Sequence, residues 1–145
     1  MKTKAEQRIE IAKDVLKWIK TGKIKVLARN CYFNPITNLS YSGEQLKDAL
    51  PQISNCEVCA LGGLFYAHIM RYNDFEIDRW GINYIDGRRE MVGELKMFSE
   101  RVLQNIEASF EATNEYKDKH KLSDDTETLK HIMNNIIKNK GTFKP

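Results

Sequence analysis

The segment spanning residues 55–72 constrains the fold more than any other part of this 145-residue chain. Its apolar side chains would surround nearly the whole circumference of a helix, and a helix that is apolar on all sides is buried. Ser54 and Glu57 have the spacing of a capping box, which predicts that the helix begins at Asn55. The pair Gly62-Gly63 in its middle indicates close approach of a neighbouring backbone. We therefore expect a central helix with the rest of the chain packed around it.

Three further long helices are expected around this centre. The first covers about residues 4–20, where apolar residues recur every three or four positions and Gly22 follows the last of them. The second is predicted from Ser99 as N-cap to about residue 113, and the third from Asp124 as N-cap to Gly141. Shorter helices are expected before Pro51 and near residues 89–97, and residues 114–121 read as a charged connection.

These elements predict a mainly α fold: a compact bundle of four main helices plus one or two short ones. At most a small β element is expected near residues 24–33, where a short strand and an irregular extended segment fit equally well. No internal repeat or linker divides the sequence, so residues 1–145 are expected to form a single helical domain. The first helix could pair with a second copy of the chain through its apolar seam, or pack within its own bundle.

Composition favours a cytoplasmic protein. No apolar run approaches the roughly 18 residues that a membrane span needs. Charges occupy the N-terminal positions where a signal peptide would be apolar. Three cysteines, an odd number, fit a reducing compartment better than a disulfide framework.

Charge is distributed unevenly along the chain. Residues 1–30 hold nine basic and three acidic residues, whereas residues 100–128 hold eight acidic and four basic ones. A basic stripe of this kind could bind a macromolecule, with a protein partner favoured and nucleic acid as an alternative. The favoured interpretation of the stripe itself is a solvated helix face or an intramolecular complement of the acidic segment, and a complement in a second copy is also open. The stripe consists of Lys13, Lys17, Lys20, Lys23, Lys25 and Arg29.

Cys56 and Cys59 form a C-x-x-C pair that allows three interpretations. On the expected helix, Cys56 would lie in the first turn, where the helix dipole favours a thiolate. Together with Cys31 and His68 the pair could assemble a zinc site, or the two thiols could be redox-active. The favoured interpretation is that they pack in the core as small apolar side chains, so no metal or cofactor is expected.

A small-ligand or nucleotide site is the main alternative to macromolecular binding. Arg88 and Arg89 could bind a phosphate and Trp80 could stack on a base, with Tyr84 beside them. No catalytic constellation is present in the sequence, and the chain is not expected to be an enzyme. The remaining histidines and paired carboxylates are expected at the surface, namely His120, His131, Glu107 and Glu111.

Three segments resemble small hypothetical proteins of bacteriophages and prophages. They are the run C-x-x-C-A-L-G-x-L-F from Cys56 to Phe65, the region from Phe98 to Glu111, and the stretch from Leu129 to Phe143. The resemblance covers about residues 54–145. It implies a phage accessory protein acting in a bacterial cytoplasm, and it assigns no role to any residue.

The sequence thus leads to a ranked set of functions. A non-enzymatic binding protein that engages a host or phage macromolecule comes first. A small-ligand or nucleotide binder that sequesters a signalling molecule comes second, and a zinc or thiol protein comes third.

Overall fold

The structure is a computed structural model of the whole chain. It describes residues 1–28, 33–35, 46–53, 56–72, 87–111 and 115–145. Within these ranges, no helix combines the length and the apolar character needed to cross a membrane.

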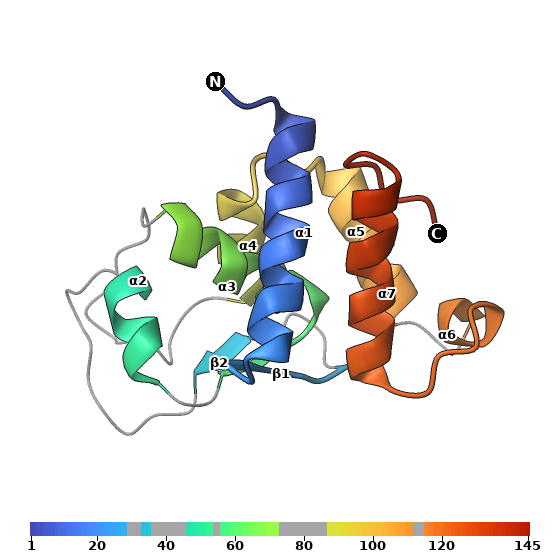
Figure 1. Cartoon of the computed structure of the whole chain (residues 1–145), viewed down its shortest axis with the longest axis horizontal. Helices are drawn as coiled ribbons and strands as arrows, with labels where there is room; N and C mark the ends of the chain where they lie inside the picture. Colours follow the sequence, from blue (N-terminus) through green and yellow to red (C-terminus); the bar gives the residue numbers. More distant parts are fainter. Residues whose placement is uncertain (29–32, 36–45, 54–55, 73–86, 112–114) are drawn as a thin grey trace.

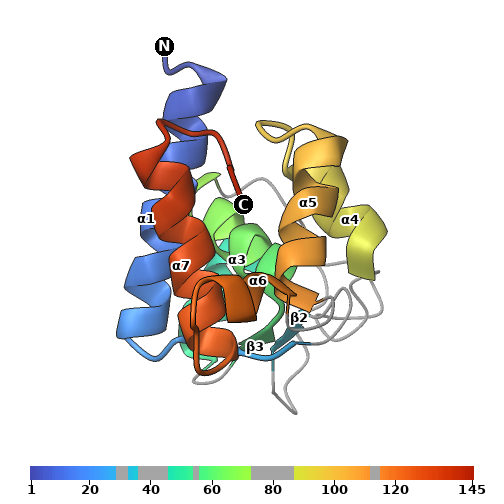
Figure 2. The same ribbon diagram turned by 90° about the vertical axis from the view of Figure 1, so that its right-hand side faces the viewer.

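Three helices form the centre of the molecule. Helices α1 (Lys4–Lys20) and α7 (Asp125–Lys138) lie side by side, and α3 (Ala60–Tyr72) packs against α1 from within (Figure 1). Figure 2 shows α3 between this pair and the helices α4 (Gly87–Glu94) and α5 (Glu100–Glu111). The expected mainly α fold is confirmed.

Helix α3 is the buried core of the bundle. Every residue from Ala60 to Ile69 is buried, as expected for a helix that is apolar on all sides. A Cβ at Gly63 would lie 3.4 Å from Leu129 and 3.7 Å from Val15 and Val58. The glycine therefore accommodates neighbouring side chains, whereas the sequence suggested a neighbouring backbone.

The predicted start of this helix is wrong, because residues 56–58 form a strand. Strand β3 (Cys56–Val58) pairs in parallel with β1 (Ile24–Val26) and antiparallel with β2 (Phe33–Pro35), giving the order β1-β3-β2. The helix begins only at Ala60, so Glu57 lies in the sheet and closes no capping box, and Cys56 is not in a first turn. Ser54 lies outside the described residues. The strand expected near residues 24–33 is present as β1 and extends into a three-stranded sheet.

Local signals correctly predicted both ends of α1 and the starts of α5 and α7. Thr3 caps α1, Ser99 accepts a hydrogen bond from the Val102 N–H at 3.1 Å, and Asp124 accepts one from the Glu127 N–H at 2.8 Å. After α1, Gly22 adopts a φ of +77°, and its N–H donates to the carbonyl of Ile19 at 3.1 Å, as in a Schellman motif.

The short elements follow the sequence less closely. Helix α2 (Leu46–Ala49) and the 3-10 turn η1 (Leu50–Gln52) occupy the place of the short helix expected before Pro51. Helix α4 begins and ends earlier than expected. Residues 115–119, predicted as part of a charged connection, form the short helix α6 (Glu115–Lys119), because its buried residue Tyr116 packs on the neighbouring helices.

Candidate functional site

Three lysines of the predicted basic stripe form one exposed row on α1. Lys13, Lys17 and Lys20 recur at intervals of four and three residues, so they lie on one face of the helix, about 10 Å from end to end. All three are exposed, and none forms an ion pair with another described residue. We call these three residues the basic ridge.

The other members of the stripe do not extend the ridge uniformly. Lys23 is half-buried after the end of α1. Lys25 is exposed on β1 but lies beside Glu57 in the parallel register, so an acidic residue borders it. Arg29 lies outside the described residues.

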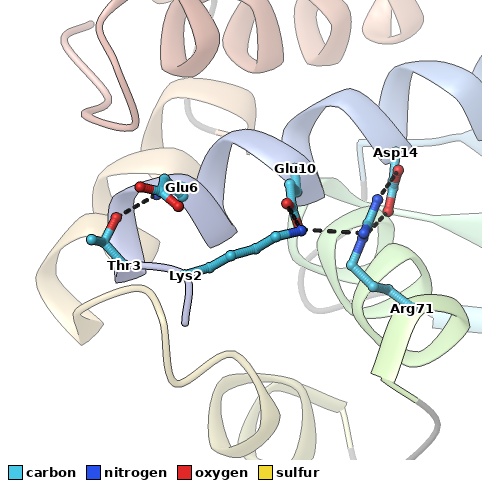
Figure 3. A network of polar contacts seen from close by, with 6 residues as sticks. All are labelled: Lys2, Thr3, Glu6, Glu10, Asp14 and Arg71. Atoms are coloured by element: carbon cyan, nitrogen blue, oxygen red, sulfur yellow. Dashed lines mark hydrogen bonds and ion pairs between the residues drawn. The ribbon is translucent and has the colours of Figure 1, made fainter.

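Acidic neighbours of the ridge are engaged by α3. On a helix surface Glu10 and Asp14 neighbour Lys13 and Lys17 at a spacing of three. Arg71 donates two hydrogen bonds to Asp14, at 2.7 and 3.0 Å, and its Nη1 lies 3.3 Å from Oε2 of Glu10 (Figure 3). Lys2 forms an ion pair with Glu10 from the other side. The hydrogen bonds that Asp14 accepts raise the pKa of Arg71 further above its ordinary value. Both carboxylates thus have cationic partners outside the ridge.

A shallow depression of about 270 Å³ adjoins the ridge between α1 and α3. Its lining includes Lys17, Trp18 and Arg71. The Lys17 ammonium lies 4.7 Å from the centre of the Trp18 ring, a cation–π contact, and the Trp18 ring meets Tyr66 edge-on at 5.6 Å. Lys17, the middle lysine of the ridge, therefore packs over the ring of Trp18, which in turn packs against Tyr66.

Cys56 and Cys59 lie at the corner between β3 and α3. Both are buried, with 1% and 2% exposure. The sulfur of Cys59 accepts a hydrogen bond from the Gly62 N–H at 3.4 Å, and its carbonyl accepts one from Gly63 at 2.8 Å. Cys59 thus occupies the capping position of α3 that the sequence assigned to Ser54.

His68 lies on the same helix, 5% exposed. Its ring lies 4.9 Å from the Tyr72 ring, and its Nε2 is 3.7 Å from Oε2 of Glu94. In the described part of the chain no three His, Cys, Asp or Glu side chains are placed to hold a metal ion. Cys31, the remaining member of the hypothetical zinc set, lies outside that part.

The residues of the alternative ligand site are largely not described. Trp80 and Tyr84 lie outside the described residues, as does the side chain of Arg88. Arg89 is exposed in the first turn of α4.

Sequence reasoning missed a cluster of rings where α6 meets α7. The hydroxyl of Tyr116 lies 2.7 Å from Nδ1 of His131, and the His120 and His131 rings lie 4.3 Å apart. Both histidines are half-buried rather than at the open surface. The spacing of four between Tyr116 and His120 was a usable signal, but His131 joins them only through tertiary packing.

Glu111, at the end of α5, is also not the exposed carboxylate that the sequence suggested. Burial raises its pKa to about 7, helped by the nearby charges of Asp125 and Glu107. Asp125 in turn accepts a hydrogen bond from the Ala28 N–H at 3.0 Å, which ties the start of α7 to the segment after β1.

The comparisons with known proteins found no match. No protein family, no curated protein and no solved structure is detectably similar to this chain.

Proposed function

We propose that this chain is a non-enzymatic binding protein that engages an acidic surface of a partner protein through its basic ridge. The observation that carries the proposal is the capture of Glu10 and Asp14 by Arg71 and Lys2. It leaves Lys13 and Lys17 without the helical partners that Glu10 and Asp14 would otherwise offer, and Lys20 has no acidic residue three or four positions away.

A protein partner is favoured over nucleic acid by the size of the ridge. Three lysines over about 10 Å are fewer than the roughly 6–10 phosphate contacts that give a strongly salt-dependent complex with duplex DNA. Exposed acidic residues such as Glu6 on the same helix would also repel a phosphate backbone. An acidic protein surface can place a few carboxylates opposite the ridge while avoiding Glu6.

The proposed setting is the bacterial cytoplasm, with a host or phage protein as the partner. The resemblance of residues 54–145 to small phage proteins supports this setting. The expected charge asymmetry also allows a second copy of the chain as the acidic partner, and a mass measurement of the free protein distinguishes this case.

A direct binding experiment tests the ridge. A fluorescent polyglutamate peptide is titrated with the protein between about 50 and about 200 mM salt, and anisotropy gives the Kd. We expect the double variant Lys17→Glu, Lys20→Glu to bind at least about tenfold more weakly, because two attractive charges become repulsive. The matched control is Lys96→Glu with Lys130→Glu, which changes the net charge equally at two exposed lysines outside α1.

Three results would overturn the proposal. They are equal affinity of the ridge and control variants, affinity independent of salt, and no binding of the peptide at all. Tighter binding of duplex DNA than of the peptide, with the same loss in the ridge variant, would replace the protein partner by nucleic acid.

A second variant tests whether Arg71 keeps Glu10 and Asp14 from pairing with the ridge lysines. Arg71→Met releases Asp14 and Glu10, which can then pair with the lysines three positions away. We expect it to weaken peptide binding by about twofold, the size of one such helical ion pair, although no ridge residue is changed. The control is Arg101→Met, an exposed arginine on α5; equal binding by both variants would show that Arg71 has no part in exposing the ridge.

A further inference from the structure

Helix α6 is too short to be stable by itself, so its position depends on packing. It has five residues, of which Tyr116 is buried. Isolated helices shorter than about 12 residues are marginal in water. Helix α6 packs against α5, and the side chain of Tyr116 connects it to α7.

The ring contacts of Tyr116 involve two imidazoles and one phenyl ring. The Tyr116 ring lies 4.4 Å from His120, 5.5 Å from His131 and 6.1 Å from Phe143. The two imidazole rings lie 4.3 Å apart, with their planes tilted by 37°. The rings beside Tyr116 thus include His120, the histidine at the end of α6.

The geometry favours a neutral His120. A second positive charge on the stack would lie 4.3 Å from the first, and the Lys119 ammonium is a further nearby positive charge. The Nε2 atom of His120 is buried and has no hydrogen-bond partner among the described residues, so a proton placed there would lack an acceptor. The charged groups that face His120 are thus Lys119 of α6 and His131 of α7. Lys119 is itself exposed and contacts the backbone oxygen of Pro145 at 3.4 Å.

We propose that Tyr116, His120 and His131 form a pH-sensitive latch, in which protonation of His120 beside the His131 ring releases α6 from α7. The step moves only protons from solvent to the imidazole nitrogens. Released, His120 is solvated and can bind its proton freely, so proton uptake and release of α6 favour each other.

The direction of the pH effect follows from the same coupling. Burial and the neighbouring charges lower the pKa of His120 in the docked state below its ordinary value. Docking is therefore fully favoured above the ordinary pKa of histidine, about 6.5, and weakens as the pH falls below it. Glu111 acts in the opposite direction, because its raised pKa of about 7 favours the folded state as the pH falls. The substitution Glu111→Gln removes this opposing pH dependence, so that the effect of His120 can be measured alone.

The test is an NMR titration of the whole protein carrying Glu111→Gln, from about pH 7.5 to about pH 5. Imidazole carbon signals report the protonation of each histidine, and amide signals report the state of α6 and α1. We expect His120 to titrate below its ordinary pKa. In step with that titration, amide exchange at residues 120–122, whose N–H groups donate to carbonyls of α6, should rise several-fold after correction for intrinsic rates, while α1 stays protected.

The variant His120→Gln keeps a polar side chain and cannot take up the proton. In this variant we expect the exchange of α6 to be independent of pH over the same range. The latch is overturned if α6 stays equally protected at low pH, if His120→Gln shows the same pH dependence, or if α1 and α6 lose protection together. The last result would indicate global acid unfolding. If the variant does not fold, the comparison of α6 with α1 in the parent protein still decides between these outcomes.

Discussion

At Gly141 the backbone leaves the end of α7 and passes directly against α1. Its φ is +94°, and a Cβ built there would lie 2.8 Å from the Ala5 carbonyl oxygen. Arg8 donates to the Gly141 carbonyl at 2.7 Å and to the Met97 carbonyl at 2.7 Å. A single residue position thus joins the C-terminal segment, α1 and the turn before α5.

Replacing Gly141 by alanine should destabilise the protein, and the same substitution at Gly93 provides the comparison. Gly141→Ala should lower the free energy of unfolding by about 2 kcal/mol or more, because the left-handed backbone is strained and the methyl group meets backbone atoms. Gly93→Ala on α4, where a Cβ meets nothing within 4 Å, should instead raise it by about 0.5–1 kcal/mol. Urea unfolding measures both values; similar effects in the two variants would contradict the tight contact at Gly141.

At the scale of elements, the corner between β3 and α3 buries both Cys56 and Cys59. The strand places Cys56 in the sheet, and the next turn places Cys59 at the cap of α3 with its sulfur bonded to Gly62. Burial keeps solvent and reagents away from both sulfurs. This favours packing as the role of the pair, with Cys59 serving as a cap as well.

Thiol labelling tests this role. In a Cys31→Ser background, Cys56 and Cys59 should react with a disulfide reagent orders of magnitude more slowly in the native protein than in denaturant, because both are at most 2% exposed. The additional substitution Cys59→Ser identifies which thiol reacts. Rapid labelling of the native protein at neutral pH would move the thiol hypothesis ahead of packing.

At the scale of the whole molecule, one apolar core connects all the long helices. Gly63 of α3 brings Val15 of α1 and Leu129 of α7 to a common point, and β3 contributes Val58 to it. Because these elements come from both ends of the chain, no part of the core is complete without the others.

This shared core predicts a single unfolding transition. In a Trp80→Phe background, the fluorescence of Trp18 on α1 and far-UV circular dichroism should give the same urea midpoint. Ile132→Ala, at a fully buried position of α7, should lower the stability by about 2–5 kcal/mol and shift both signals equally. Separate midpoints for the two signals would show that residues 1–145 contain more than one cooperative unit.

The sequence by itself determined the elements whose bonds are local. The bounds of α1 and the start of α7 follow from Thr3, Gly22 and Asp124, because caps and helical hydrogen bonds connect residues at most five positions apart. The common face of Lys13, Lys17 and Lys20 follows from the same short-range periodicity. The mainly α class follows from these helices together.

Only the tertiary structure decided the features that depend on distant partners. Residues 56–58 form a strand because their backbone partners are residues 24–26 and 33–35, and an apolar run of this length fits a buried strand as well as a helix. The exposed state of the ridge depends on Arg71, which lies 57 positions from Asp14. The ring cluster joins Tyr116 to His131 across two helices. Hydrogen bonds, ion pairs and stacking are short-ranged in space but unrestricted in sequence, so no local pattern in the chain records which residues they bring together.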